Sequence, residues 1–345
     1  MKIKSPILIV FLLLPIVMIA QVGGRNAFPF LDLNFNARQA ALGGPLLSVQ
    51  DDDVNVGVLN PAALNQEMHK KVSFSHAFHA GKINYGQFSY AHAFDEKNYL
   101  SAFIQYMGYG TMERRATNGE LLGDFTPFEY NLGVGYGRKI NKVLSVGANL
   151  RLIGSHIDTY SSYGASVDLA GMYYTKNKTF GVTAMVRHAG VQFNSYVTDR
   201  DPLPTNFQIG LGYKLPHAPF RFSILMHHLN KWDLTYSDPT ATATYDALTG
   251  EWVEPKIPGF FEKLANHFTY QVEVNAGKVV HIRAAFDYYR RQSMKLEARP
   301  GAAGFSFGVG LHFKRFALDY GLALYSRAGM NNVLTFSMNL QKVKI

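Results

Sequence analysis

A two-residue period of apolar and polar side chains constrains this chain more than any other feature of its sequence. Between 144 and 152 every second residue is Leu, Val or Ala, and the residues between them are small or polar. The same period recurs in 128–137, 206–213, 304–313 and 333–340. Because neighbouring side chains of a strand point to opposite faces, this period gives each strand one apolar and one polar face. The sequence therefore predicts an all-β structure with many such strands.

The N-terminus has the pattern of a secretory signal peptide. Lys2 and Lys4 precede an unbroken apolar run from Pro6 to Ala20, and polar Gln21 follows. We expect residues 1–20 to be removed by cleavage after Ala20. A membrane anchor is the alternative, but this run is shorter than the roughly 20 apolar residues that a spanning helix needs.

Composition favours a membrane protein without spanning helices. No later stretch approaches the apolar length of the first one, yet aromatic residues make up 14% of the chain and the mean hydropathy is -0.06. A closed barrel pairs all its backbone hydrogen-bonding groups and is apolar only at alternate positions, so its mean hydropathy stays low. The absence of cysteine fits a fold that does not depend on disulfides. We therefore predict a transmembrane antiparallel β-barrel.

The net charge of +9, or +7 without Lys2 and Lys4, limits the classes of partner. The basic residues are scattered through the predicted strands and loops, with no arginine-rich arm or recognition helix, which argues against nucleic acid. Outer-membrane lipid or lipopolysaccharide is the better partner for the surplus.

About 14 segments between Val72 and Leu340 have the period and length of a tilted transmembrane strand. Every second link between them is short, whereas the others include the long ones, 108–127, 191–204, 230–265 and 290–303. This separation is typical of periplasmic turns and cell-surface loops. The predicted strands begin near Val72, Ile83, Asn98, Phe128, Leu144, Ser162, Lys178, Thr205, Pro219, Asn266, Val279, Gly304, Phe316 and Val333.

Residues 21–71 differ in composition from the predicted wall, 72–345, and we expect them to form a plug in the lumen. Ala37 to Leu42, which includes Arg38, is a run of helix formers, and Gly43-Gly44 is suited to end a helix. Asn60 and Pro61 fit the N-cap and first position of a second short helix. A surface turn at Asn60-Pro61 remains an alternative.

Three consecutive carboxylates, Asp51, Asp52 and Asp53, lie inside the predicted plug. Clustered carboxylates can bind calcium. The simpler interpretation is that they meet arginines or free N–H groups inside the barrel.

The polar faces of the predicted strands carry charges of both signs beside many glycines. Such charges suit an interior filled with water or protein, and glycines allow another segment to approach the wall closely. The wall and the plug segment are therefore expected to pack together. The charged positions are Arg151, Asp168, Arg187, Glu273, Arg283, Asp287 and Asp319.

No catalytic, cofactor or metal motif stands out. Gly304 to Gly308 matches G-x-S-x-G, but its serine lies within an alternating strand rather than at a strand-to-helix turn. His227 and His228 are adjacent on a predicted strand, so we expect them to face opposite sides and not to share an ion.

Both tryptophans of the chain, Trp232 and Trp252, lie in the largest loop. Exposed aromatic residues are typical of docking surfaces. The alternative is that both belong to the interfacial aromatic belt or pack the loop against itself.

The motifs Ala37-Arg38-x-Ala40-Ala41-Leu42-Gly43-Gly44, Asp51–Asn55 and Asn60-Pro61-Ala62 resemble the start of the FadL-like (PorV-like) outer-membrane barrels. Within that superfamily the chain is more closely similar to the PorQ family of the type IX secretion system. The motifs for this narrower resemblance are Phe30–Leu33, Asn65–His69, Gly81–Gly86, Tyr160–Gly164, Leu203-Pro204 and His217–Phe222.

The resemblance implies a 14-stranded barrel with an N-terminal hatch and no enzymatic activity. The PorQ family implies an outer-membrane anchor that docks the surface protein PorZ through its extracellular loops, within machinery that includes PorU and PorV. The wider FadL-like group implies instead passive transport of hydrophobic small molecules.

Overall fold

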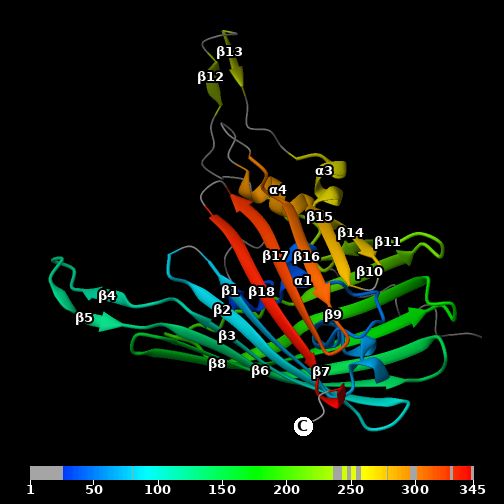
Figure 1. Cartoon of the computed structure of the whole chain (residues 1–345). Helices are drawn as coiled ribbons and strands as arrows, with labels where there is room; N and C mark the ends of the chain where they lie inside the picture. Colours follow the sequence, from blue (N-terminus) through cyan, green and yellow to red (C-terminus); the bar gives the residue numbers. More distant parts are fainter. Residues whose placement is uncertain are drawn as a thin grey trace, which may run out of the picture.

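The wall of the molecule is a closed antiparallel barrel of 14 strands (Figure 1). The structure is a computed structural model that describes residues 26–79, 81–235, 243–246, 250–253, 258–277, 279–295, 301–326 and 329–342. The predicted signal peptide and its cleavage site lie outside the described residues. The wall strands are β1 Lys71–Phe78, β2 Asn84–Ala93, β3 Asn98–Gly108, β6 Phe128–Lys139, β7 Leu144–Ile157, β8 Tyr160–Tyr174, β9 Phe180–Asn194, β10 Asn206–Lys214, β11 Phe220–Met226, β14 Phe268–Ala276, β15 Val280–Asp287, β16 Phe305–His312, β17 Phe316–Ser326 and β18 Gly329–Asn339.

Each wall strand pairs with the next one along the chain, and β1 pairs with β18 to close the ring. Lys71 lies opposite Asn339, and Phe78 lies opposite Asn332. The fold class predicted from the sequence is confirmed. The predicted strand starts differ little from the observed ones, and the largest difference is Val333 against Gly329.

The links of the barrel separate into two ends. At the turn end, strands are joined by short links such as 140–143 and 313–315. At the loop end, the long links carry elements that the sequence pattern did not predict and that project from the wall in Figure 1. These elements are the hairpin β4 Met112–Arg115 with β5 Leu121–Phe125, the hairpin β12 Thr244–Asp246 with β13 Glu251–Val253, α3 Phe260–Ala265 and α4 Tyr288–Met294.

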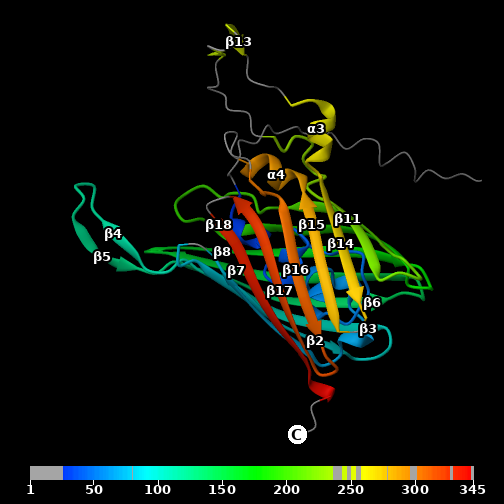
Figure 2. The ribbon, with the colours of Figure 1, turned by 45° about the horizontal axis from the view of Figure 1, so that its top comes forward.

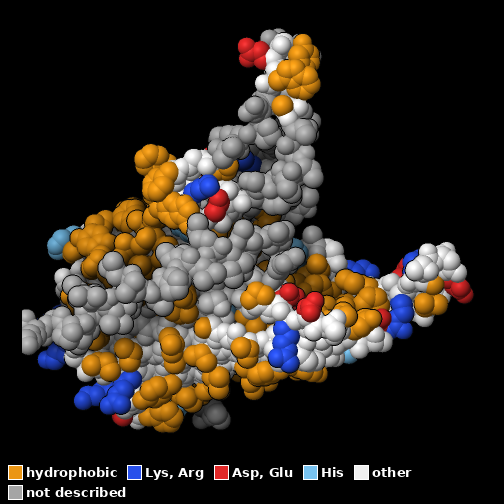
Figure 3. All heavy atoms as spheres, turned by 180° about the vertical axis from the view of Figure 1, so that it is seen from behind, with side chains coloured by type: hydrophobic (Ala, Val, Ile, Leu, Met, Phe, Trp, Pro, Cys, Tyr) orange, Lys and Arg blue, Asp and Glu red, His pale blue; other side chains and the backbone are white. Residues whose placement is uncertain are grey.

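Burial in the wall is inverted relative to a soluble protein. On β6, which lies between β3 and β7, Leu132 and Val134 are 42% and 52% exposed, whereas their neighbour Asn131 is fully buried. Apolar side chains cover the outer face in Figure 3. Such a wall suits a lipid environment, because in a membrane barrel the apolar side chains face the lipid and the polar ones face the lumen. Within the described residues, no helix is both long and apolar enough to cross a membrane.

The segment before β1 lies inside the barrel (Figure 2) and consists of short helices joined by turns. We call residues 27–70 the plug. Its α1 and α2 and most of its other residues are buried. The helical elements are the 3₁₀ helix η3 Pro29–Asp32, α1 Ala37–Ala41, α2 Val54–Leu59, the 3₁₀ helix η4 Pro61–Ala63 and the 3₁₀ helix η5 Gln66–Met68.

Side-chain caps begin four of these helices. Asn36, Asp53, Asn60 and Asn65 each accept a hydrogen bond from a backbone N–H in the first turn that follows. The predicted first helix therefore begins where expected, and Gly43 follows its end with a φ of +68°. The predicted second helix is a single buried 3₁₀ turn at Pro61–Ala63, so the surface-turn alternative is wrong.

Wall glycines provide the space for the plug. A Cβ at Gly147 would lie 2.6 Å from the backbone nitrogen of Ala62, and one at Gly321 would lie 2.9 Å from the carbonyl carbon of Ala37. Real Cβ atoms do not approach backbone this closely, so any other residue at these positions would displace the plug.

We predict that Gly147→Ala loosens the plug but leaves the wall closed, because the added methyl overpacks the contact by about 1–3 kcal/mol. Protease cleavage within 43–60 measures the first effect, and heat-dependent gel mobility measures the second. Gly171→Ala is the matched control, since a Cβ at Gly171 has no atom within 4 Å. Equal cleavage in both variants would contradict the prediction.

Candidate functional site

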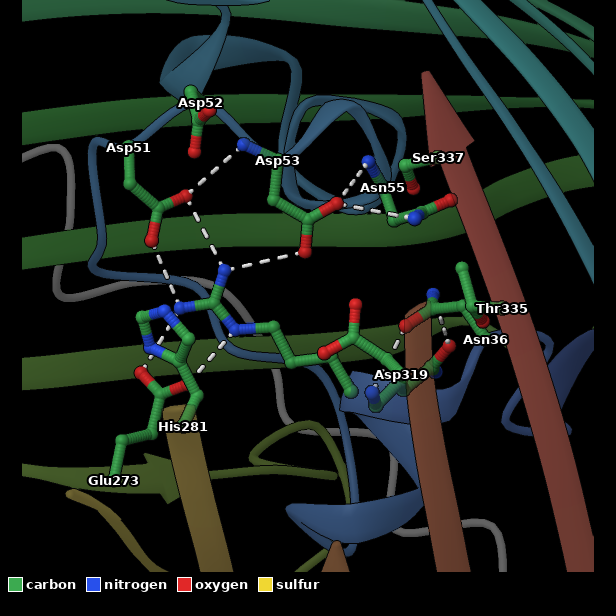
Figure 4. Close-up of polar contacts among 12 residues, drawn as sticks. Asn36, Asp51, Asp52, Asp53, Asn55, Glu273, His281, Asp319, Thr335 and Ser337 are labelled. Atoms are coloured by element: carbon green, nitrogen blue, oxygen red, sulfur yellow. Dashed lines mark hydrogen bonds and ion pairs between the residues drawn. The ribbon is translucent and has the colours of Figure 1, made fainter. Parts of the chain in front are cut away.

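Arg38 of α1 uses all five of its N–H donors, two toward the wall and three within the plug. Its Nε and Nη2 donate to the two carboxylate oxygens of Glu273 on β14, each at 2.9 Å. Nη2 also donates to Asp51 at 2.8 Å, and Nη1 donates to Asp51 and Asp53 at 3.2 Å. Figure 4 shows the three carboxylates converging. A bidentate pair of this kind is among the strongest polar contacts available to a protein.

Two wall arginines extend this contact. Arg221 of β11 donates to Glu273 at 2.7 Å, and Arg283 of β15 lies between Glu273 at 3.1 Å and Asp319 of β17 at 2.5 Å. The resulting group holds three guanidinium cations and four carboxylates. We call it the latch cluster: Arg38, Asp51, Asp53, Arg221, Glu273, Arg283 and Asp319.

Among the plug carboxylates, Asp51 is held ionised by these partners. Burial alone would raise the pKa of Asp51, but Arg38 and Arg221 lower it to about 2. Asp52 lies outside the cluster and pairs with Lys71 at the turn end. The interpretation in which the aspartates meet arginines and N–H groups therefore describes this site, since Asp53 also accepts from the N–H of Asn55 at 3.0 Å.

A chain of amides holds the opposite side of the plug. The Asn55 side chain donates to Asp53 and to Ser73 of β1, each at 3.0 Å, and accepts from Gln87 of β2 at 2.9 Å. Gln87 accepts from Gln105, and Gln105 accepts from Asn131, each at 2.7 Å. The latch cluster is thus linked across the lumen to β6.

A second buried ion pair lies on the β7–β8 side of the wall. Arg151 donates to Asp168 from Nε at 2.8 Å and lies 4.7 Å over the ring of Phe103. Asn149 donates to Asp168 and to the carbonyl of Val58 in the plug, each at 3.0 Å. This pair therefore also faces the plug.

The predicted lumen charges divide into separate groups. Glu273, Arg283 and Asp319 belong to the latch cluster, and Arg151 pairs with Asp168. Arg187 is buried on the inward face of β9, and no ion pair to it occurs within the described residues. Asp287 instead caps α4 by accepting from the N–H of Arg290 at 3.0 Å.

The latch cluster contains one residue that the sequence analysis missed. Arg221 alternates with Phe220 and Phe222, so the two-residue period was sufficient to place it on the inward face. Its partners could not be predicted from the sequence, because Asp51 and Glu273 lie far from it along the chain.

An apolar layer fills the lumen toward the loop end. We call it the aromatic layer: Phe28, Phe30, Leu31 and Phe35 of the plug with Ala77, Tyr85, Ile153, Leu203 and Val333 around them. The ring of Phe35 lies 5.4 Å from Tyr85 and 6.5 Å from Phe30, both edge to face. Such rings favour this arrangement, which adds about 0.5–1.5 kcal/mol per pair. The plug thus places its own phenylalanines in a wall-lined apolar site.

In the described part of the chain, no group of three or more His, Cys, Asp or Glu side chains is arranged so that it could hold a metal ion. The expected separation of His227 and His228 is wrong. β11 ends at Met226, and a φ of +55° at His228 turns the two rings together, with their Nδ1 atoms 2.8 Å apart. Burial lowers the pKa of both rings to about 3, so they remain neutral.

The two tryptophans occupy different parts of the largest loop. Trp232 is 47% exposed, and its ring centroid lies 5.2 Å from that of Phe260 in α3. Trp252 lies in β13, is 69% exposed and contacts Tyr245 at 5.5 Å. The structure does not bring the two tryptophans into one contact.

Several solved outer-membrane barrels have the same architecture. The toluene transporter TodX of Pseudomonas putida matches with a TM-score of 0.56 at 12% identity, over 90% of this chain and 99% of that one. The toluene transporter TbuX of Ralstonia pickettii gives 0.54 at 13% identity over the same shares. A FadL homologue of Pseudomonas aeruginosa gives 0.51 at 9% identity over 88% and 98%.

The fold is that of the FadL-type outer-membrane barrels. No protein-family model matches the sequence. No curated protein matches it either. The narrower resemblance to the PorQ family finds no support in these comparisons and stays a prediction.

We predict that Arg38→Gln releases the plug, because it leaves the buried carboxylates of the latch cluster with two guanidinium groups instead of three. Breaking a buried pair in this way costs about 3–5 kcal/mol. Hydrogen exchange of residues 37–63 at increasing urea concentration measures the loss. Lys71→Gln is the control, since its partner Asp52 is 59% exposed and such pairs contribute about 0–1 kcal/mol. Equal protection in the two variants would count against the latch.

Proposed function

We propose that this protein is an outer-membrane barrel that admits small hydrophobic molecules to its lumen at the loop end and passes them toward the turn end. This is the function that the resemblance to the wider FadL-like group implies. The observation that carries it is the aromatic layer, a wall-lined apolar site near the loop end. The fold shared with toluene transporters supports the same class of substrate.

The aromatic layer is suited to a flat apolar molecule. Phe35 of the plug occupies an edge-to-face contact with Tyr85 that an aromatic guest can make once the plug has shifted. Ligand sites are usually apolar with a few polar groups that fix orientation. Here Asn331 donates to the Tyr85 hydroxyl at the edge of the layer.

The route past the aromatic layer runs along the lumen. β3 pairs with β2 from Asn84 to Ala93 and with β6 from Phe128 to Arg138, so this part of the wall is continuous. A passing molecule therefore requires the plug to shift. The plug is held in the lumen by non-covalent contacts and joined covalently to the wall only at the start of β1, so it can shift without breaking a covalent bond.

A plug locked by a disulfide tests this proposal, and the chain is suited to it because it has no cysteine. A Cβ at Gly43 would lie 3.6 Å from that of Ala285, within the range of disulfides. We predict that vesicles with an outer leaflet of lipopolysaccharide, which resists apolar solutes, take up labelled toluene faster with the wild-type protein than without protein. Oxidised Gly43→Cys/Ala285→Cys should not accelerate uptake until it is reduced.

Each single cysteine variant serves as a control for the lock. No uptake by the wild-type protein would overturn the transport function. Uptake that persists in the oxidised double variant would overturn only the route through the plug.

A second candidate is the docking role, in which the loop end holds the surface protein PorZ beside PorU and PorV. The observation that favours it is the exposure of aromatic side chains on the 227–267 link, with Phe260 and Phe261 at 61% and 82% and Trp252 at 69%. Such side chains are typical of the centre of protein interfaces.

For this candidate we predict that deletion of 232–258, or Phe260→Ser with Phe261→Ser, removes a stoichiometric surface protein from pull-downs of the intact barrel. Val197→Ser is the matched control, because Val197 is 83% exposed on a different link. Recovery of bound lipid or hydrocarbon without such a partner would exclude docking.

A further inference from the structure

The sequence suggests that the basic residues are scattered. In the structure, many of the exposed ones lie together at the turn end. We call the main group of them the basic rim. All of its members are exposed, and they lie at the links β2–β3, β6–β7, β8–β9 and β10–β11. The members are Lys97, Arg138, Lys139, Lys142, Lys176, Lys178 and Lys214.

The four links of the basic rim form one continuous arc. The N–H of Lys139 donates to the carbonyl of Lys97 at 2.8 Å, and the N–H of Tyr174 donates to that of Val143 at 2.8 Å. The N–H of Lys214 donates to the carbonyl of Thr179 at 2.7 Å. Neighbouring links are therefore in direct backbone contact, and their charges act on the same part of the surroundings.

The charges of the basic rim are largely uncompensated. Within the described residues, its only ion pair joins Lys178 to Glu67 at 3.2 Å. Asp95 lies in the same arc, but its carboxylate caps the N–H groups of Lys97 and Asn98. Glu96 is the other exposed carboxylate of these four links. Cations therefore outnumber carboxylates along the rim.

On the β4–β5 hairpin and the 195–205 link of the loop end, carboxylates balance the cations. On the β4–β5 hairpin, Arg115 pairs with Glu113, and Arg114 pairs with Asp158. Arg200 lies between Asp199 and Asp201 on the 195–205 link. Figure 3 shows Lys and Arg at the lower left of the molecule and both charge signs on the projecting hairpin at its right. The asymmetry is therefore a property of one end.

The basic rim also lies at a defined depth in the membrane. Tyr136, Tyr173 and Tyr213 are the last aromatic residues on the outward rows of their strands and are 42–44% exposed. Tyrosines in this position mark the boundary between hydrocarbon and headgroups. Arg138 follows Tyr136 on the same outward row. Long basic side chains just beyond such a belt reach the lipid phosphates.

We propose that the basic rim binds the headgroups of anionic phospholipid, such as phosphatidylglycerol, in the leaflet around the turn end. Short turns face the periplasm in barrels of this kind, so this leaflet is the phospholipid leaflet and not the lipopolysaccharide one. The rim then fixes the depth and orientation of the barrel. This role is independent of what passes through the lumen.

Native mass spectrometry of the purified barrel, reconstituted in nanodiscs of phosphatidylethanolamine and phosphatidylglycerol, tests the proposal. We expect the wild-type protein to retain phosphatidylglycerol preferentially. The triple variant Arg138→Gln/Lys139→Gln/Lys142→Gln should lose at least tenfold of that preference, since each surface cation contributes roughly fivefold. High salt should lower the wild-type preference as well.

A matched triple variant at the loop end controls for net charge. Lys82→Gln/Arg115→Gln/Arg200→Gln removes the same charge from exposed positions and should retain the preference. Heat-dependent gel mobility checks that each barrel is folded, and single substitutions replace a triple that is not. Equal retention of both lipids by the wild type, or equal losses of preference in the two triple variants, would overturn the proposal.

Discussion

Closure of the strand ladder is the constraint on which the rest of this structure depends. Hydrocarbon offers no partner to a backbone N–H or carbonyl, so the ladder must return on itself, as it does where β1 meets β18. Once it is closed, every second side chain points into a lumen. These side chains include arginines, carboxylates and amides that must find partners there.

The plug provides those partners. Its small residues fit against wall glycines such as Gly147 and Gly321, and Arg38 supplies a cation between carboxylates of plug and wall. A buried network of this kind is costly to desolvate and contributes more to a unique position than to net stability. The latch cluster therefore fixes where the plug lies, while apolar contacts above and below it fill the remaining space.

The two ends of the barrel differ in chemistry. Toward the loop end the lumen is lined by the aromatic layer, and the links beyond it expose large aromatic side chains. Toward the turn end the lumen holds the latch cluster, and the outer edge carries the basic rim. The lumen is therefore apolar toward the loop end and charged toward the turn end, and the outer edge of the turn end is cationic.

The sequence by itself determined the wall. The two-residue period placed 14 strands, the alternation of short and long links gave two ends, and inward charges such as Asp168 could be assigned, because all of these are local properties of a strand. Helix α1 was readable for the same reason, from the helix formers Ala37 to Leu42 and from Gly43-Gly44 after them. Only the tertiary structure decided which charges meet. Arg38 and Glu273 are 235 residues apart, and their contact depends on barrel closure and strand register. The facing of His227 and His228 depends on where β11 ends. The basic rim exists because consecutive strands pair and so set four successive turns side by side.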